Sequence, residues 1–294
     1  MIVAKDIHKS FGKKEVLKGV TFEMGRGETV ALMGANGAGK STLFDILSTL
    51  DPRFQGSATV GGYDVRTQPL EVKGAVGYVP GLFSLYEDLS VKENLVFFAK
   101  AFGCNPDDIH KLSPYLWRSL EPFSEIRAGH LSGGMKQKLA ICCAMVHNPS
   151  VLLLDEPTVG VDPVSRADMW KEIAALRKTG VSVLVSTHYL DEAARADKIL
   201  FLHQGVMMLY DTPQGILHSY RHNLYSLPCE STRLSEVEAE LKNRRGVIDI
   251  YLYGDKVHII ADEDFDPAPV IGRPLTRIEP EMEDIFIETL SSRL

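Results

Sequence analysis

The residues best suited to chemistry form a glycine-rich run that ends in a lysine and two hydroxyl residues. The run reads Gly34-Ala35-Asn36-Gly37-Ala38-Gly39-Lys40-Ser41-Thr42. Glycines let backbone N–H groups approach phosphate oxygens closely, and a helix that starts there adds the positive end of its dipole. We therefore predict a nucleoside triphosphate site with Mg²⁺. Lys40 should reach the β- and γ-phosphates, and Ser41, supported by Thr42, should bind the metal.

Two carboxylates, Asp155 and Glu156, directly follow the apolar run Val151–Leu154. The carboxyl ends of strands are where ligands bind in open α/β sheets. We expect Asp155 to hold Mg²⁺ through water, and Glu156 to orient and polarise the attacking water. Alone, the pair could be a charged strand end that faces solvent. Beside a phosphate-binding loop, it predicts nucleotide hydrolysis.

The elements that must position these residues follow from the apolar periodicity. Residues 30–33 form a short apolar run of buried-strand type, and Leu43, Ile46 and Leu47 then recur at helical spacing. Strand, glycine-rich loop and helix is the order that a phosphate-binding loop needs. Other strands are expected at residues 2–6, 20–23, 75–79, 151–154 and 181–186, and helices at 134–146 and 163–178. This alternation predicts an α/β fold around a parallel sheet.

Two other parts of the chain depart from this alternation. Residues 85–130 are more polar and more helical, with prolines that break them into short pieces. Near residues 211–215 the character changes again. The elements expected beyond that point are a strand at 224–229, a helix through Leu234, Val237 and Leu241, a hairpin turning at Gly254-Asp255, and a closing helix at 279–290. We interpret them as a small C-terminal α+β appendage.

The composition limits the class of protein. Of 294 residues, 45% are apolar and 24% charged, as in a globular chain with one large core and a small second domain. The formal net charge of −7 argues against a nucleic-acid partner, because duplex binding needs clustered lysine and arginine. We expect no membrane span and no signal peptide, so any membrane role should depend on a partner. Cys104, Cys142, Cys143 and Cys229 lack metal-ligand spacing and are interpreted as reduced thiols.

A serine-glycine-glycine segment resembles a motif of a known protein family. Leu131-Ser132-Gly133-Gly134-Met135, followed by Lys136-Gln137-Lys138-Leu139, resembles the signature motif of ATP-binding-cassette (ABC) ATPases. A serine and two glycines at a helix start are suited to bind a γ-phosphate. The resemblance implies that Ser132, Gly133 and Gly134 bind ATP held by the phosphate loop of an opposite subunit. It therefore implies a head-to-tail dimer with two composite sites for ATP and Mg²⁺.

Three more residues match the family in chain order. Phe11 lies where the family has an aromatic residue that stacks on adenine, although an ordinary core phenylalanine is the alternative. Asp162, in residues 160–163, resembles the key residue of a loop that contacts the partner subunit. His188, at the end of residues 186–188, resembles the residue that senses the γ-phosphate. With Lys40 and Glu156, the resemblance implies that His188 serves catalysis.

One departure from the family pattern concerns Gly81, which ends the run Gly77-Tyr78-Val79-Pro80-Gly81. Family members usually have a glutamine there, as a ligand for Mg²⁺ and water. Glycine has no side chain to replace it, so hydrolysis could be slower, and a heterodimer with one weakened site becomes more plausible. We expect turnover to persist because Lys40, Asp155 and Glu156 remain. The alternative is a nucleotide-gated clamp that hydrolyses little.

The domain order and the later motifs indicate the type of ABC protein. By resemblance, residues 1–215 form the ATPase domain, with a helical subdomain at about 82–145, and residues 216–294 form a C-terminal accessory domain. Residues 82–95 resemble the segment that docks a membrane subunit in exporters of the ABC-2 type, and residues 280–290 resemble their C-terminal helix. The implied function is ATP hydrolysis that powers drug, lipid or polysaccharide export by a separate permease.

The resemblance also implies partners and a location. The partners are an ABC-2 permease, a second ABC ATPase subunit that is identical or related, and a membrane-fusion protein in the assembled exporter. The implied location is cytoplasmic, on the inner face of the cell membrane. The competing interpretation is a translation or repair factor of the same superfamily. Such factors carry two cassettes or a coiled-coil insertion, whereas this chain has one uninterrupted cassette and no heptad run.

Overall fold

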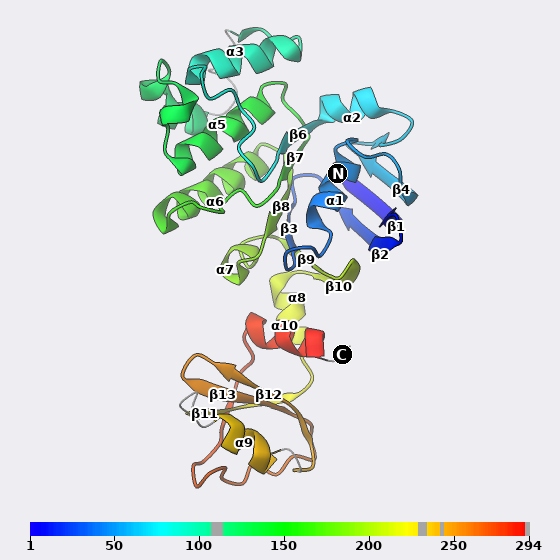
Figure 1. Cartoon of the computed structure of the whole chain (residues 1–294), viewed down its shortest axis with the longest axis vertical. Coiled ribbons are helices and arrows are strands. Elements are labelled where there is room, and N and C mark those ends of the chain that lie inside the picture. The colour runs from blue at the N-terminus through cyan, green and yellow to red at the C-terminus, as the bar shows by residue number, and fades with distance from the viewer. Residues whose placement is uncertain (107–113, 229–233, 242–243, 292–294) are drawn as a thin grey trace. The chain divides into compact units, whose positions relative to one another are not determined.

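The computed structural model describes residues 1–106, 114–228, 234–241 and 244–291. The chain divides into two compact units, Met1–Thr212 and Pro213–Leu294 (Figure 1). Within the described ranges, no helix is both long and apolar enough to cross a membrane. Cys104, Cys142 and Cys143 are free cysteines, whereas Cys229 lies outside the described residues.

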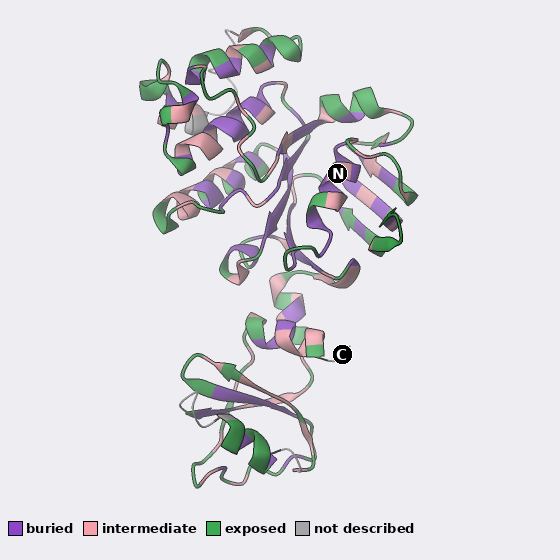
Figure 2. Cartoon of the chain, in the orientation of Figure 1, coloured by how far each residue is buried: buried purple, intermediate pink, exposed green. Residues whose placement is uncertain are grey.

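A six-stranded sheet forms the centre of the first unit, in the order β10-β9-β3-β8-β7-β6. Its strands are β3 (Thr29–Met33), β6 (Val76–Val79), β7 (Val151–Leu154), β8 (Ser182–Thr187), β9 (Lys198–His203) and β10 (Val206–Asp211). Neighbouring strands are parallel except β10, which runs antiparallel to β9. Every residue of β3, β7 and β8 is buried, as expected for parallel strands covered on both faces (Figure 2). The predicted parallel α/β sheet is confirmed.

Helices lie on both sides of this sheet (Figure 1). The helices are α1 (Lys40–Leu47), α2 (Pro69–Ala75), α3 (Val91–Ala101), α4 (Pro114–Leu120), α5 (Gly133–Met145), α6 (Pro163–Lys178) and α7 (Leu190–Ala193), with 3₁₀ turns η2 (Glu121–Phe123) and η3 (Ala128–His130). Helices α3 and α4 both pack against α5 and form a helical subdomain. A capping box starts α3: Ser90 Oγ accepts from Glu93 N–H at 3.1 Å, and Glu93 accepts from Ser90 N–H at 2.8 Å.

Alternate residues of β7 belong to different apolar cores. Leu152 and Leu154 pack in one cluster with residues of α5 and α6. Val151 and Leu153 pack in the other, with residues of α1 and of the first strands of the chain. Successive side chains of a strand point to opposite faces of the sheet, so the two apolar cores cover both faces of β7. The strand ends, and the polar residues that follow them, are thereby fixed in space.

A second, antiparallel sheet has the order β2-β1-β4-β5. Its strands are β1 (Ile2–Phe11), β2 (Lys14–Met24), β4 (Gln55–Val60) and β5 (Tyr63–Asp64). The strands predicted at residues 2–6 and 20–23 were too short. Strands β1 and β2 form a long hairpin whose last residue pair is Phe11 and Lys14. Register shifts within β1, near Asp6 with its positive φ of 53°, interrupt the apolar alternation that the prediction used.

The second unit has a four-stranded antiparallel sheet in the order β12-β13-β11-β14. Its elements are α8 (Pro213–Ser219), β11 (Asn223–Pro228), α9 (Leu234–Leu241), β12 (Val247–Tyr253), β13 (Lys256–Ala261), β14 (Thr276–Ile278) and α10 (Met282–Ser291). The hairpin turns at Gly254, where φ is 62°. Asp284 is buried in α10 and accepts hydrogen bonds from Tyr251 Oη, from His258 Nδ1 at 2.8 Å and from Glu281 N–H at 2.6 Å. The predicted α+β appendage is confirmed.

Candidate active site

The phosphate loop, residues 34–42, joins the carboxyl end of β3 to α1. Gly37 and Gly39 have φ of 81° and 110°, in the left-handed region that favours glycine. A Cβ atom on Gly34 would lie 2.3 Å from the carbonyl oxygen of Leu202, so the backbone of β9 excludes a side chain there. The loop conformation therefore requires glycine at these three positions.

The start of α1 presents backbone amides to any anion in the loop. The helical hydrogen bonding begins with Leu43 N–H, which donates to Gly39 O at 3.0 Å. The amides of Lys40, Ser41 and Thr42 consequently have no acceptor within the helix. Together with the positive end of the helix dipole, they form an anion-binding helix terminus.

Lys40 lies over this loop with 5% of its surface exposed. Its Nζ donates to Gly34 O at 2.7 Å and to Ala35 O at 3.3 Å, and forms an ion pair with Glu156 Oε1 at 3.0 Å. The ammonium is therefore held at the mouth of the loop, between the loop carbonyls and the second carboxylate. Its contact with the β- and γ-phosphates stays a prediction.

Asp155, the first carboxylate after β7, is buried and carries two short hydrogen bonds. Ser41 Oγ donates to its Oδ2 at 2.8 Å, and Ser186 Oγ donates to its Oδ1 at 2.6 Å. Ser186 Oγ also accepts from Glu156 N–H at 2.7 Å. The structure thus brings together the two predicted metal ligands, Ser41 and Asp155. The sequence did not predict a role for Ser186, which depends on the parallel pairing of β7 with β8.

Glu156, the second carboxylate, has a φ of 47°. Such a conformation costs a non-glycine residue roughly 1–3 kcal/mol and is found most often at functional sites. Its Oε2 lies 3.6 Å from His188 Nδ1, while its Oε1 pairs with Lys40. The His188 ring packs on Tyr189, with 4.1 Å between centroids. The three predicted catalytic residues therefore lie together at the ends of β3, β7 and β8.

A cavity of about 430 Å³ opens on these groups. It is lined by Phe11, Lys14, Val16, Asn36, Gly37, Gly39, Lys40, Ser41, Thr42 and Glu156. The volume falls within the range of small-molecule sites, roughly 300–1,000 Å³. Of the loop residues outside this lining, Ala35 accepts a hydrogen bond from Ala38 N–H at 3.1 Å. Lys14 and Val16 were not predicted, because only the long β1–β2 hairpin brings them to the loop.

The signature residues do not line this cavity in their own chain. Ser132 caps α5, where its Oγ accepts from Met135 N–H at 3.3 Å, and it is exposed together with Gly133. A Cβ on Gly134 would lie 3.0 Å from Ser165 Cβ, at the start of α6. Glycine there lets the starts of the two helices approach each other.

Asp162 also lies outside the cavity, at the start of α6. Its carboxylate accepts from Val164 N–H at 3.1 Å and from Ser165 N–H at 3.0 Å, which makes it the N-cap of the helix. The Ser165 side chain and these backbone amides hold the pKa of Asp162 below its ordinary value. Within the chain its observed role is therefore to start α6, and a role at the partner subunit stays a prediction.

Gly81 lies two residues after the end of β6 and next to the backbone of Asp155. A Cβ atom at this position would lie 3.2 Å from the Asp155 carbonyl oxygen, a tight but small overlap. Asp155 N–H in turn donates to Val79 O at 2.9 Å. A longer side chain at position 81 would therefore start next to the backbone of the residue that was predicted to hold the metal.

A buried carboxylate behind the site was not predicted. Glu192 Oε2 accepts from Thr158 Oγ1 at 2.9 Å and from Thr187 Oγ1 at 2.8 Å. Thr158 follows Glu156 by two residues, and Thr187 precedes His188. Glu192 therefore connects the segments that carry both catalytic side chains. In the sequence, the only indication of this role is the glutamate itself, which the structure places in the short helix α7.

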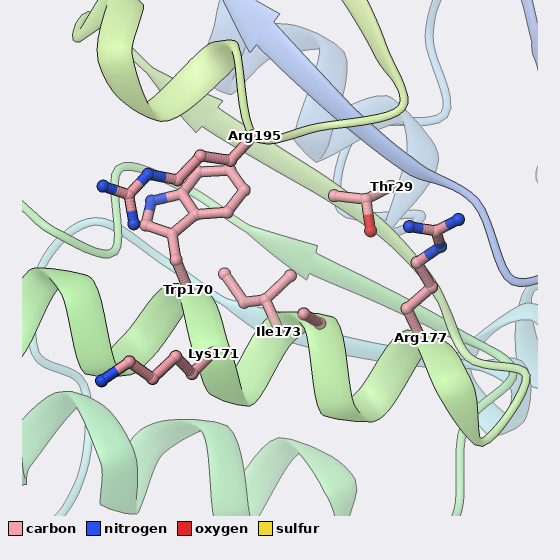
Figure 3. Close-up of a pocket in the computed structure, with 7 residues that line it drawn as sticks. Thr29, Trp170, Lys171, Ile173, Arg177 and Arg195 are labelled. Atoms are coloured by element: carbon pink, nitrogen blue, oxygen red, sulfur yellow. The ribbon is translucent and has the colours of Figure 1, made fainter.

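A second cavity, of about 200 Å³, lies at the opposite end of the sheet. Thr29, the first residue of β3, lines it, whereas the phosphate loop follows the last residue of that strand. Figure 3 shows Trp170 and Ile173 rising from α6 between Arg195 and Arg177. Arg177 is paired with Asp197 at 2.9 Å. This cavity is separate from the cluster of catalytic groups.

The fold and the site together define a phosphate-loop nucleoside triphosphatase. Residues 17–159 match the ABC transporter family. The linearmycin resistance ATP-binding protein LnrL of Bacillus subtilis is 36% identical over 215 residues, which cover 72% of this chain and 69% of that protein. The probable multidrug ABC transporter ATP-binding protein YbhF of Escherichia coli is 37% identical over 274 residues, which cover 90% of this chain and 47% of that protein.

A solved structure agrees with these sequence relatives. It is a dimeric ATP-binding cassette in a post-hydrolysis state, bound to ADP and Pi, with a TM-score of 0.63 and 26% identity over 72% of this chain and 98% of that one. The chain belongs to the ABC transporter family and is an ATP-binding subunit with ABC-type ATPase function. Cassettes of this family dimerise and work with membrane permeases. The predicted family, fold class and enzyme class are confirmed.

Proposed function

We propose that the chain hydrolyses Mg-ATP at the phosphate loop and thereby drives a separate permease of the ABC-2 exporter type. The observation that carries the proposal is the convergence of three segments on one point. Ser41 Oγ lies 2.8 Å from Asp155, and Lys40 Nζ lies 3.0 Å from Glu156. Phosphate binding, metal binding and water activation need these residue types within reach of one γ-phosphate.

The donor set fits Mg²⁺, which prefers oxygen ligands and keeps several waters. Ser41 Oγ and Asp155 are the protein groups that would hold it, with Ser186 fixing the carboxylate. The metal would neutralise charge on the phosphate oxygens. Lys40 would contact the β- and γ-phosphates, which offer its ammonium stronger acceptors than the loop carbonyls do.

Glu156 is the residue that would orient and polarise the attacking water. It follows the buried β7 directly, and its carboxylate is held by Lys40 on one oxygen and faces His188 on the other. His188 would sense the γ-phosphate from the next strand of the sheet. Phe11 would stack on adenine, because it lines the same cavity and half of its surface is exposed.

The dimer is proposed from what each chain presents outside its own site. Ser132 and Gly133 are exposed at the start of α5, and Asp162 is exposed at the start of α6. In a head-to-tail dimer, Ser132, Gly133 and Gly134 would bind the γ-phosphate held by the partner, and the loop of Asp162 would contact the partner. The dimeric relative with ADP and Pi supports this arrangement. The partner would be a second copy or a related cassette.

Export is proposed from the relatives and from an exposed apolar surface. The relatives named above are ATP-binding proteins of linearmycin resistance and of probable multidrug transport. Leu82 is 85% exposed, and Tyr86 packs on Phe97 with 4.8 Å between ring centroids, both partly exposed. We propose that this surface docks the permease, and that the chain works on the cytoplasmic face of the membrane. A membrane-fusion protein would complete the assembled exporter.

A second candidate, a clamp that closes on ATP and hydrolyses little, is favoured by Gly81 alone. Glu156→Gln distinguishes the two. Under the transport proposal the wild type hydrolyses ATP, whereas Glu156→Gln loses at least about 100-fold in rate and accumulates an ATP-bound dimer. Size-exclusion chromatography with ATP and Mg²⁺ measures the dimer, and phosphate release measures the rate. A wild type that forms the stable dimer without hydrolysis would support the clamp and contradict the transport proposal.

A further inference from the structure

Lys9 is a buried cation next to the nucleotide cavity. It lies on β1, and 4% of its surface is exposed. Its Nζ donates to Asp51 Oδ2 at 2.5 Å and to Arg53 O at 2.6 Å. A buried ammonium is unfavourable unless it is paired and hydrogen-bonded, and these partners meet that requirement. Arg53 Nε also donates to Asp51 at 3.1 Å, so the carboxylate is itself fixed.

The same ammonium lies over the ring of Phe11. The distance from Lys9 Nζ to the ring centroid is 4.8 Å, within the range of cation–π contacts. Lys9 and Phe11 are two residues apart on one strand, and this contact shows that their side chains lie on the same side, although the pairing with β2 shifts register between Lys9 and Ser10. Phe11 is 51% exposed and therefore receives little support from packing. The fixed ammonium is therefore a specific contact of this ring.

The contact also joins two parts of the nucleotide site. Phe11 ends β1, whereas Asp51 follows the helix that begins at the phosphate loop. Asp51 N–H donates to Asp45 O of that helix at 3.1 Å. Lys9 is therefore tied through Asp51 to the far end of α1. The position of the aromatic ring and that of the phosphate loop are linked by the Lys9–Asp51 ion pair.

We propose that Lys9 is a positioning residue for ATP: it fixes the Phe11 ring at the distance from the phosphate loop that a bound adenine requires. The inference rests on the proposed stacking of adenine on Phe11. The ammonium attracts ring electrons toward its own face, so the opposite face becomes a better partner for an electron-rich purine. Lys9 acts on the base through Phe11 and touches no phosphate.

The test compares ATP with inorganic tripolyphosphate, which has the phosphates but no base. The variant is Lys9→Met combined with Asp51→Asn, so that Asp51 does not keep a charge that has lost its lysine partner. We expect its Kd for Mg-ATP to rise about three- to tenfold, with KM rising equally and kcat unchanged. Its Kd for Mg-tripolyphosphate should stay within twofold of wild type. In a Phe11→Ala background, the same pair of changes should have no further effect on ATP binding.

Lys5→Met is the matched control, because Lys5 is an exposed lysine of the same strand. It should bind both ligands as the wild type does. An unchanged Kd for ATP in the folded Lys9 variant would overturn the proposal, as would equal weakening of ATP and tripolyphosphate. A full additional loss in the Phe11→Ala background would also overturn it. Failure of the proposed function would look different, since the wild type itself would then bind no Mg-ATP.

Discussion

Replacing Ser186 with alanine should disturb the proposed Mg²⁺ site, because Ser186 holds the carboxylate of Asp155. Ser186 is fully buried; its hydroxyl donates to Asp155 at 2.6 Å and accepts from Glu156 N–H at 2.7 Å. A hydrogen bond to a charged group contributes about 1.5–3 kcal/mol, and a neutral one about 0.5–1.5 kcal/mol. We expect Ser186→Ala to lower the free energy of unfolding by roughly 2–4 kcal/mol. For a unit of this size, Tm should fall by roughly 4–15 °C.

The same change should weaken Mg²⁺-dependent activity. Asp155 would keep its contact with Ser41 but lose the one that fixes its other oxygen. Loss of an orienting partner behind a metal ligand typically weakens metal affinity by about 10–100-fold. The assay is the ATPase rate against Mg²⁺ concentration at saturating ATP, at a temperature where both proteins are folded. The Mg²⁺ concentration for half-maximal rate should rise by that factor.

Ser182→Ala is the matched control from the opposite end of the same strand. Ser182 is equally buried; it donates to Gly25 O at 2.9 Å, accepts from Gly27 N–H at 3.0 Å and, over a longer distance of 3.4 Å, accepts from the Met1 ammonium. We expect a smaller loss of stability, roughly 1–3 kcal/mol, and an unchanged Mg²⁺ requirement. If Ser186→Ala kept the Mg²⁺ dependence of wild type, or if Ser182→Ala shifted it equally, the inferred role of Ser186 would be wrong.

Three further predictions follow from the geometry. Gly81→Gln should raise the ATPase rate and lower the Mg²⁺ requirement, because its side chain would start beside the Asp155 backbone and would add an amide ligand that glycine lacks; an inactive wild type would contradict the inference that the site turns over. Glu192→Ala should cost roughly 3–6 kcal/mol because two buried threonine hydroxyls lose a charged acceptor, whereas Glu192→Gln keeps a neutral acceptor oxygen and should cost about half as much in a urea titration; equal losses would refute this. The hydrogen bonds from Lys9 and then Arg53 hold the pKa of Asp51 well below its ordinary value of 3.8, so this pairing stabilises the fold above pH 3.8 and the stabilisation is lost as pH falls toward the lowered pKa. Asp51→Asn should therefore flatten the dependence of the free energy of unfolding on pH in acid, and an unchanged dependence would exclude the pairing.

Much of the site could be predicted because its chemistry is contiguous in the chain. The phosphate loop combines glycines, Lys40 and Ser41 in one run, and Asp155 and Glu156 end an apolar strand. Such local patterns need only the correct strand and helix on either side, and the structure places both there. The parallel sheet was predictable for the same reason, since its buried strands are apolar throughout.

The unpredicted residues depend on pairing between distant segments. Ser186 reaches Asp155 only because β8 lies next to β7 in parallel register. Lys14 reaches the cavity because the β1–β2 hairpin extends beyond the strands that the apolar residues predicted. Register shifts interrupt the alternation of apolar residues in this hairpin. The lysine that orients Phe11 has no local signal, because its partners lie more than 40 residues away in the chain. Strand register and ion pairs between distant segments cannot be predicted from the periodicity of apolar residues.

The most direct test of the central claim is calorimetric titration of the full chain with ATP, with and without Mg²⁺, for wild type and Lys40→Ala. The loop carbonyls and Glu156 hold Lys40 where it would meet the β- and γ-phosphates. We expect the wild type to bind ATP in a Mg²⁺-dependent manner and Lys40→Ala, at a temperature where both proteins are folded, to bind at least about tenfold more weakly. Absence of Mg²⁺-dependent binding by the wild type, or equal affinity in both proteins, would contradict a nucleotide site at this loop.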